Sequence, residues 1–189
     1  WDSFTTNSAY HHYAVDAVSD NVIYAGGYGG SFLKSADGGD TWDLLGIGST
    51  DWVNAIHFED ELTGWIVACP GNTDPGDILK TTDGGNTWTS YHDQYQYSSM
   101  DWPSSSVGYA GTWEGVIVKT TDGGDTWTDL TVPSNDNIYY LYFVNESYGF
   151  AIDNNYRLYR TADGGSSWEQ FFHVGISAVY FHDENNGFC

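Results

Sequence analysis

Positively charged side chains are scarce in this sequence. Its 189 residues include 5 Lys or Arg against 26 Asp or Glu, which gives a formal net charge of −21 at pH 7. Proteins that bind nucleic acids or anionic membrane surfaces depend on Lys and Arg, so this balance argues against both classes of partner. An acidic surface of this kind keeps a protein soluble by repulsion and suits a medium in which salt or calcium screens the charge.

Cysteine and long apolar runs are also nearly absent. Cys69 and Cys189 are too few for a disulfide framework and lack the spacing of a metal site, so we expect two separate buried thiols. No stretch approaches the roughly 20 apolar residues of a membrane helix, and we expect no membrane insertion. The six histidines are scattered without a metal-ligand spacing, and the sequence therefore predicts no metal site.

Aromatic residues and glycine are abundant instead. Aromatic residues make up 17% of the chain and 23 residues are glycine, a composition that favours a turn-rich all-β protein. The chain is long enough to form one domain with its own hydrophobic core. We therefore expect a single all-β domain over residues 1–189.

One eight-residue pattern occurs four times. It reads [ST]-x-D-G-G-x-[ST]-W and covers residues 35–42, 81–88, 120–127 and 161–168. Successive tryptophans of the pattern are 46, 39 and 41 residues apart, which indicates an internal repeat. Trp1 lies 41 residues before Trp42, and we interpret it as the last residue of a further copy whose front half is absent.

Short apolar runs fill the space between the copies. Two runs separated by a polar turn, typical of a β-hairpin, lie between successive copies. A third run precedes each copy and a fourth follows it. Each repeat is therefore predicted to hold four antiparallel strands, A to D, with the eight-residue pattern at the C–D turn. Four antiparallel strands in about forty residues is the size of one blade of a β-propeller.

The blade boundaries follow from this repeat. We expect a lone strand D over residues 1–6, blades over about residues 7–48, 49–94, 95–133 and 134–173, and a partial blade over residues 174–189. The predicted fold class is thus an all-β propeller of four-stranded antiparallel blades, with about four and a half blades present. We favour a section of a larger ring of about six to eight blades, and the alternative is a ring of about five blades closed by the N-terminal strand.

The eight-residue pattern resembles the Asp-box of bacterial-neuraminidase-type repeats. Such repeats occur in sialidases, two-propeller xyloglucanases, sortilin-type receptors and photosystem II assembly factors, so the resemblance implies a propeller. In those families the box lies away from the active or binding face. The resemblance therefore implies a structural role for the Asp and Trp residues of the four copies, Asp37, Trp42, Asp83, Trp88, Asp122, Trp127, Asp163 and Trp168.

Elementary chemistry also favours a structural role for the pattern. Its paired glycines supply the positive φ that a tight turn requires, and its Asp carboxylate can accept hydrogen bonds from the turn backbone. The Ser and Thr residues add side-chain bonds, and we expect the tryptophan to bury its ring against the next blade. Calcium binding by one box is an alternative, although Ca²⁺ prefers six or more oxygen ligands and no other cofactor is expected.

Four of the five basic residues share one position of the repeat, three residues before the Asp of the pattern. These are Lys34, Lys80, Lys119 and Arg160, and we expect them to pair with the acidic surface. Only Arg157 remains, whereas sialidases of the resembling type hold their substrate carboxylate with three arginines. The residues present therefore argue against a sialidase. The basic patch expected of photosystem II assembly factors is absent as well.

The B–C and D–A loops are expected on the face opposite the C–D turns, where propeller function usually resides. Aromatic rings with carboxylate and amide neighbours occur in these loops and suit binding of a protein or a sugar. The alternative is that the rings only pack the loops together. The candidate ligand-binding residues are Tyr28, Trp52, Asp74, Asp77, Tyr95, Trp113, Glu114, Tyr156 and Arg157.

Loop carboxylates allow two further readings. The longest loop, residues 71–77, holds two Asp and one Asn that are candidate Ca²⁺ ligands, with a polar turn as the alternative. A glycoside hydrolase requires two carboxylates about 5–10 Å apart. The loop candidates for such a pair are Asp51, Asp74, Asp77, Glu114 and Asp153, and the sequence does not pair them.

Together these features predict a non-catalytic, secreted or cell-surface β-propeller module. It is expected to bind a protein, a glycan or a second copy of itself through the loops opposite the boxes, and we assign no catalytic residues. The extracellular location rests on the acidic, Lys-poor composition and on the start at Trp1, which we interpret either as a processed end or as the start of a piece of something longer. The alternative function is part of a glycoside hydrolase resembling the two-propeller xyloglucanases.

Overall fold

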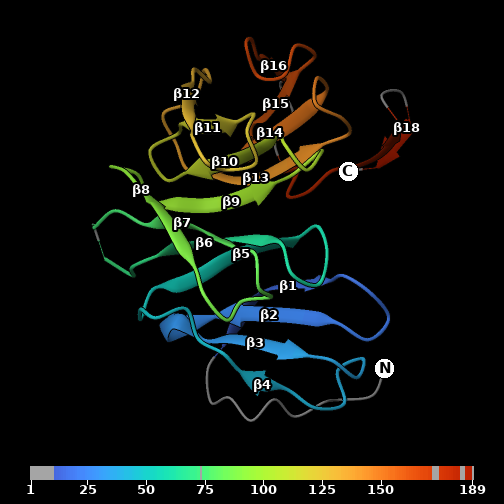
Figure 1. Ribbon diagram of the computed structural model, residues 1–189. Coiled ribbons are helices and arrows are strands. Elements are labelled where there is room, and N and C mark those ends of the chain that lie inside the picture. The colour runs from blue at the N-terminus through green and yellow to red at the C-terminus, as the bar shows by residue number, and fades with distance from the viewer. Residues whose placement is uncertain (1–10, 73, 172–174, 184–185, 189) are drawn as a thin grey trace. The chain divides into compact units, whose positions relative to one another are not determined.

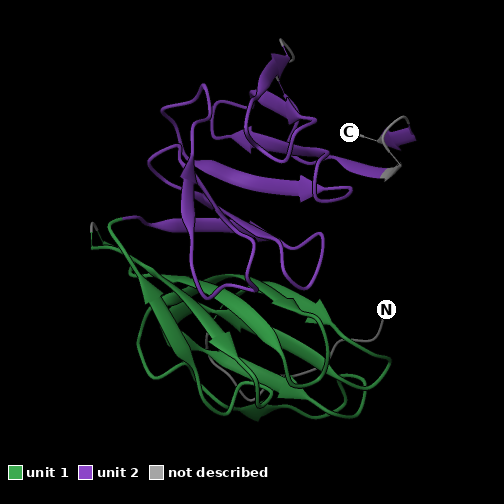
Figure 2. Ribbon diagram, turned by 45° about the horizontal axis from the view of Figure 1, so that its top comes forward, with its two compact units in different colours: residues 1–94 green, residues 95–189 purple. Residues whose placement is uncertain are grey.

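The computed structural model describes residues 11–72, 74–171, 175–183 and 186–188. In this part of the chain the regular structure is β-strand apart from one short 3₁₀ turn, η1 (Tyr28–Gly30). The strand predicted over residues 1–6 lies outside the described residues. The chain divides into two compact units, residues 1–94 and 95–189, and each is considered by itself (Figure 2).

The first unit holds two sheets of four antiparallel strands each, with the strands in chain order (Figure 1). The first sheet consists of β1 (His12–Ala17), β2 (Ile23–Gly27), β3 (Phe32–Ser35) and β4 (Asp43–Leu44). The second consists of β5 (Trp52–Phe58), β6 (Gly64–Cys69), β7 (Asp77–Thr81) and β8 (Thr89–His92).

The second unit repeats this arrangement and adds a hairpin. One sheet consists of β9 (Tyr97–Asp101), β10 (Gly108–Thr112), β11 (Ile117–Thr120) and β12 (Thr128–Leu130). The next consists of β13 (Ile138–Phe143), β14 (Gly149–Asp153), β15 (Leu158–Thr161) and β16 (Glu169–Phe171). The hairpin consists of β17 (Tyr180–Asp183) and β18 (Asn186–Phe188).

These sheets are the blades of a β-propeller, which confirms the predicted fold class. Each complete sheet has four antiparallel strands in the order A to D, and the Asp-Gly-Gly pattern lies at its C–D turn. The hairpin corresponds to strands A and B of a further blade. Strand B is buried along its whole length in β6, β10 and β14, because it is central in its sheet and apolar on both faces.

The core of each unit lies between its blades. Tyr24 of β2 stacks on Phe58 of β5 with ring centroids 3.7 Å apart, and Phe32 of β3 lies beside both rings. All three side chains are buried at 5% exposure or less, so they fill the space between the first two blades. Each blade therefore depends on its neighbour to cover an aromatic face.

The Asp-Gly-Gly turn is a closed set of hydrogen bonds. The carboxylate of Asp37 accepts the Ser35 hydroxyl at 2.8 Å, the Thr41 amide at 2.9 Å and the Thr41 hydroxyl at 2.6 Å. The Ser35 hydroxyl in turn accepts the Gly39 amide at 2.8 Å. The same four bonds recur in the other three copies. Hydrogen bonds to the ionised form lower the pKa of Asp37 to about 2.

The tryptophan of this turn packs against the preceding blade at two of the four positions. Trp88 lies edge-on to Phe32 of the preceding blade, with centroids 5.2 Å apart, and Trp168 packs on the cluster that includes Tyr109 of the preceding blade. Packing of these rings against the next blade stays a prediction. Gly85 also lies close to Phe32, where a Cβ would be 2.6 Å from the ring.

The basic residues of strand C also differ from expectation in part. Arg160 pairs with Glu169 at 2.6 Å, as predicted. Lys119 instead donates to the Gly164 carbonyl at 2.9 Å and lies 5.1 Å from the centroid of the Tyr109 ring. Lys34 lies over the Tyr24 ring in the same way, at 5.2 Å. These two lysines therefore bind an aromatic face rather than a surface carboxylate.

The cysteines and the absence of a membrane helix were also predicted from the sequence. Cys69 is buried, outside any disulfide, and its thiol donates to the Pro70 carbonyl at 3.4 Å, whereas Cys189 lies outside the described residues. Within the described ranges, no helix has the length and apolar character needed to cross a membrane.

Candidate functional site

The two ends of each sheet carry different connections. In the first blade Ala17 pairs with Ile23 beside the A–B turn, whereas Gly26 pairs with Phe32 beside the B–C loop. The C–D turn lies at the same end as the A–B turn, which we call the turn end. The B–C loop and the D–A connection lie at the opposite end, which we call the loop end. The sequence predicts function at the loop end.

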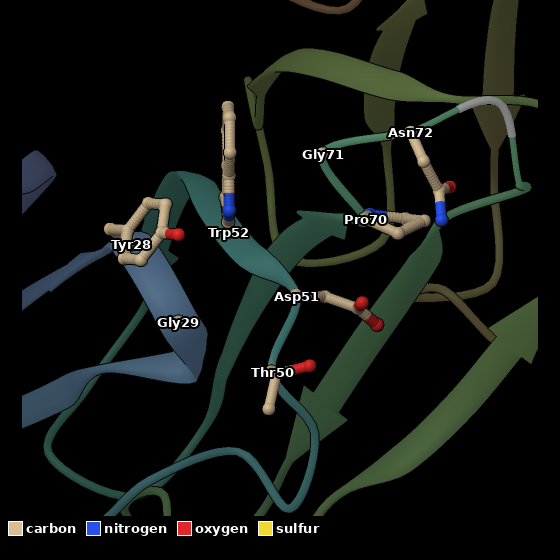
Figure 3. Close-up of a pocket in the computed structure, with 8 residues that line it drawn as sticks. All are labelled: Tyr28, Gly29, Thr50, Asp51, Trp52, Pro70, Gly71 and Asn72. Atoms are coloured by element: carbon tan, nitrogen blue, oxygen red, sulfur yellow. The ribbon is translucent and has the colours of Figure 1, made fainter.

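A pocket of about 520 Å³ opens at the loop end of the first unit (Figure 3). It is formed by the B–C loops of both blades and by the connection between them. Its lining residues are Tyr28, Gly29, Thr50, Asp51, Trp52, Pro70, Gly71 and Asn72. Two of these, Tyr28 and Trp52, are candidate ligand-binding residues from the sequence. Trp52 is the first residue of β5 rather than part of the loop before it.

Aromatic rings form one wall of this pocket. The ring centroids of Tyr28 and Trp52 are 5.3 Å apart with planes inclined by 37°, and Tyr13 approaches Trp52 at 6.3 Å and 48°. Tyr28 and Tyr13 remain 44% and 52% exposed. Close backbone contacts hold the rings in place, since a Cβ on Gly71 would lie 2.4 Å from the Trp52 ring. The rings therefore form an inclined wedge rather than one open platform.

A carboxylate faces the same pocket. Figure 3 shows the Asp51 carboxylate and the Thr50 hydroxyl on the same side of the connection, toward the loop that carries Pro70 and Asn72. Asp51 Oδ2 accepts the Ser49 hydroxyl at 3.1 Å. Among the described residues no Lys, Arg or His forms an ion pair with Asp51. The pocket thus combines aromatic faces with the negative charge of Asp51, which no ion pair among the described residues neutralises.

A smaller pocket of about 280 Å³ lies in the second unit, and Glu114, Asp129 and Asn135 contribute to its wall. The backbone amide of Gln96 donates to the Glu114 carboxylate at 3.3 Å. Tyr95 was a candidate for ligand contact, but its side chain is only 9% exposed and its hydroxyl donates to Asp129 at 2.7 Å. The structure therefore places Tyr95 behind the pocket wall.

Two further candidate rings are exposed in the second unit. Trp113 is 52% exposed and Tyr156 is 50% exposed, and both lie in B–C loops. Tyr156 has a φ of 60°, unusual for a residue with a side chain, and meets Tyr139 edge-on at 6.3 Å. These rings lie at the loop end of their own blades.

Arg157 forms ion pairs within the chain. Its Nε donates to the Asp153 carboxylate at 2.6 Å, and its terminal nitrogen pairs with Asp136. Asp153 is completely buried and also accepts hydrogen bonds from Tyr159 and Ser134. Burial alone would raise the pKa of Asp153, but these hydrogen bonds lower it below the ordinary value. Arg157 thus neutralises a buried charge, which places it in the loop scaffold.

The two Asp residues of the long loop do not converge. Asp74 accepts the Asn72 side-chain amide at 2.9 Å, whereas Asp77 is the first residue of β7 and its carboxylate lies 3.0 Å from His92 Nδ1. No group of three or more His, Cys, Asp or Glu side chains in the described ranges is arranged to hold a metal ion. The Ca²⁺ alternative stays a prediction.

Sequence reasoning missed one pair of acidic residues. Asp16 of β1 and Asp101 of β9 each reach the next blade, where they accept the backbone amides of Phe58 at 2.6 Å and Phe143 at 2.5 Å. Burial raises the pKa of Asp101 to about 6. The signal in the sequence is an Asp at the same position of strand A in the first and third blades.

Comparison with known proteins supports the fold. The sequence matches no protein-family model and no curated protein sequence. Solved structures similar to it include YCF48 bound to a D1 peptide, with a TM-score of 0.71 and 20% identity over 94% of this chain and 57% of that one. YCF48 from Cyanidioschyzon merolae has a TM-score of 0.72 and 15% identity over 97% of this chain and 67% of that one.

The GH74 enzyme of Niastella koreensis is similar as well. It has a TM-score of 0.68 and 20% identity over 87% of this chain and 30% of that one. The chain therefore spans 57% of the YCF48 chain solved with the D1 peptide and less than a third of this enzyme. At such identities the likeness shows the β-propeller fold alone.

Proposed function

We propose that this chain is a non-catalytic β-propeller module that binds a partner through its loop end. The observation that carries the proposal is the pocket of the first unit, where Tyr28 from the B–C loop of the first blade meets Asp51 from the connection between the blades and Trp52 from the start of β5. The four Asp-Gly-Gly turns are, in this proposal, Asp-boxes that hold the blades together from the opposite end. Their carboxylates each accept three hydrogen bonds within the turn, which suits a structural role.

A protein partner is the favoured ligand class, ahead of a glycan or a second copy of the chain. Exposed tyrosine and tryptophan rings occur at the loop end in both units, and such residues dominate the energetics of protein interfaces. One similar propeller, YCF48, has been solved with a peptide bound. The acidic, Lys-poor composition is in keeping with a secreted or cell-surface protein, which we include in the proposal.

The test separates the loop end from the turn end. Partners are captured from the native organism with the immobilised chain, identified, and titrated against purified variants. Tyr28→Ala and Trp113→Ala are expected to weaken binding by about tenfold or more, because each truncates an exposed ring at the loop end of its own unit. Leu62→Ala is the matched control, since Leu62 is 58% exposed and precedes β6 at the turn end.

The same variants distinguish the remaining ligand classes. A glycan array and sedimentation velocity are run in parallel with the protein titration. Binding of a glycan, or self-association, that Tyr28→Ala or Trp113→Ala abolishes would keep the loop-end proposal and change the ligand class. Equal binding by the wild-type chain and both loop variants, with loss in Leu62→Ala, would refute it.

One observation supports an enzymatic alternative. Glu114 and Asp129 both line the smaller pocket of the second unit, and glycoside hydrolysis uses two carboxylates across a cleft. The alternative function is therefore part of a glycoside hydrolase acting on a β-glucan such as xyloglucan. Release of reducing ends by the wild-type chain, lost in Glu114→Gln and kept in Asp40→Asn, would support it. No release above a buffer blank would leave the binding proposal alone.

A further inference from the structure

Resting on the proposed binding function, we propose that the pocket of the first unit receives a cationic side chain, arginine or lysine, from a basic segment of a protein partner. The aromatic wedge of Tyr28 and Trp52 would contact the cation on one side. The Asp51 carboxylate would pair with it on the other. This assigns both a ligand chemistry and a partner class to the site.

The shape of the wall favours a compact cation over a sugar ring. A sugar stacks on an open, flat aromatic face. Trp52 does not offer one, because Tyr28 approaches it at 5.3 Å and the backbone at Gly71 lies against its six-membered ring. The inclination of 37° between Tyr28 and Trp52 creates a wedge instead. A guanidinium or ammonium group near such rings is attracted by their π faces.

The polar side of the pocket has the charge that a cation requires. The Asp51 carboxylate accepts one hydrogen bond, from the Ser49 hydroxyl to Oδ2, and the Asp51 backbone amide donates to Ser49 Oγ. Oδ1 accepts no hydrogen bond in the described part of the chain. Thr50 lies next to it on the pocket wall. A carboxylate with an adjacent hydroxyl can accept two N–H groups of a guanidinium.

Four of the five Lys and Arg side chains are engaged elsewhere in the described part of the chain. Lys34 and Lys119 lie on the rings of Tyr24 and Tyr109, and Arg160 pairs with Glu169. Arg157 is bound by two carboxylates. With a net charge of −21, the protein also attracts a basic partner over long range and repels an acidic one. Charge complementarity therefore selects a basic polypeptide.

The pocket is formed in the first unit, and the equivalent place in the second unit lacks a ring corresponding to Trp52. A Cβ on Gly30 would lie 1.9 Å from the Ser49 carbonyl oxygen, so the turn that carries Tyr28 rests directly on the segment that carries Asp51. Phe58 and Phe143 occupy equivalent positions, because each donates its amide to an Asp of the preceding blade. Trp52 precedes Phe58 by the same number of residues as Asn137 precedes Phe143, so Asn137 replaces the Trp52 ring in the second unit. The second unit is thus an internal control for cation binding, because it should not bind a cation at this position.

The experiment uses the whole chain labelled with ¹⁵N and a capped pentapeptide, Ac-Gly-Gly-Arg-Gly-Gly-NH₂. We expect saturable shifts of the Trp52 indole and Gly71 amide signals, with a dissociation constant in about the millimolar range for this single contact. The peptide with citrulline, the neutral analogue of arginine, should bind at least about fivefold more weakly. Signals of Trp113 and Asn137 should not move.

Charge variants complete the test. Asp51→Asn should weaken the arginine peptide by at least about fivefold, whereas Asp40→Asn, which removes one exposed carboxylate at the turn end, should not. Raising the salt concentration should weaken binding in the wild type. Tyr28→Phe, which keeps the ring and is expected to fold, should retain binding, and Tyr28→Ala should lose most of it.

Three outcomes overturn this inference. The first is equal binding of the arginine and citrulline peptides. The second is equal binding by the wild type and Asp51→Asn. The third is a neutral oligosaccharide that shifts the Trp52 and Gly71 signals when the arginine peptide does not. In all three cases the loop-end binding function still stands on the partner titration with Tyr28→Ala and Leu62→Ala, which fails or succeeds independently.

Discussion

Tyr109 and Phe143 belong to neighbouring blades of the second unit, and their rings stack with centroids 3.6 Å apart and planes 7° apart. The Tyr109 hydroxyl continues beyond the stack and donates to the carbonyls of Glu146 at 3.0 Å and Gly164 at 3.1 Å. One side chain of strand B thus binds strand A, the A–B turn and the C–D turn of the following blade. Tyr24 and Phe58 repeat the stack in the first unit.

This relationship predicts that the ring of Tyr109 contributes more than its hydroxyl. Tyr109→Phe keeps the stack and removes two hydrogen bonds, at a cost of about 1–3 kcal/mol in the free energy of unfolding. Tyr109→Ala also removes the buried ring and should cost about 3–5 kcal/mol. Urea unfolding followed by tryptophan fluorescence measures both. Tyr13→Phe, at a ring 52% exposed, should change nothing, and an equal loss in Tyr109→Phe and Tyr109→Ala would contradict the reading.

The first glycine of the Asp-Gly-Gly pattern at residues 81–88 and a glycine outside the pattern form a matched pair for testing backbone strain. Gly84 and Gly48 have φ values of 72° and 79°, so alanine at either costs about 1–2 kcal/mol. At Gly84 the new Cβ would also lie 2.9 Å from the Glu61 carbonyl oxygen, whereas at Gly48 nothing lies within 4 Å. Gly84→Ala should therefore lower the thermal midpoint clearly more than Gly48→Ala. Equal effects would show that the turn is not pressed against its neighbour.

Asp101 predicts a pH dependence with a defined sign. Its pKa is about 6 in the folded protein and the ordinary value is 3.8, so the folded state holds the proton more tightly. Its contribution to stability is present at low pH and is lost as the pH rises from about 4 to about 6, by at most about 3 kcal/mol. Asp101→Asn should remove this part of the pH profile.

The measurement is the difference in unfolding free energy between Asp101→Asn and the wild type across pH 3 to 8. Because the other carboxylates titrate in both proteins, the difference isolates Asp101. It should grow in favour of the variant through the window and level off above about pH 7. Asp40→Asn serves as the control for loss of one carboxylate. A flat difference would mean that Asp101 ionises normally in the folded protein.

Two arginines three residues apart are predicted to differ in their effect on stability. Arg157→Met leaves the buried Asp153 carboxylate without its counter-charge and should cost about 3–5 kcal/mol. Arg160→Met breaks an exposed pair with Glu169, which is 64% exposed, and should cost about 0–1 kcal/mol. Chemical denaturation measures both. The double variant Arg157→Met with Asp153→Asn should regain most of the loss, and failure to regain it would assign Arg157 a different role.

Local chemistry explains why the blades were predictable. The Asp-Gly-Gly turn closes through bonds between residues at most four positions apart, such as Asp37 with Thr41, so its sequence suffices to specify it. The apolar run of β6 is buried throughout, and strands of that kind leave a continuous signature. The repeat spacing then predicted where each turn lies relative to the strands of its blade.

Contacts between blades were less accessible to prediction. Trp88 packs against Phe32 of the preceding blade, and Lys119 donates to the Gly164 carbonyl of the following blade. Asp101 could be seen as a repeated residue, but its hydrogen bond to Phe143 spans 42 positions. Such contacts depend on how two sheets pack against each other. A hydrophobic pattern predicts that a strand face is buried, but it does not predict which residue of the next sheet covers it.

The sequence by itself determined the repeat, the four-stranded blades, the place of every Asp-Gly-Gly turn and the end of the blade at which loops collect. It did so because these features arise from hydrogen bonds and side-chain alternation within about forty residues. Only the tertiary structure decided that Tyr28 and Trp52 meet beside Asp51 and that Arg157 is bound internally. The physical reason is that the pocket joins segments of two blades, whose packing brings together residues that no local spacing relates.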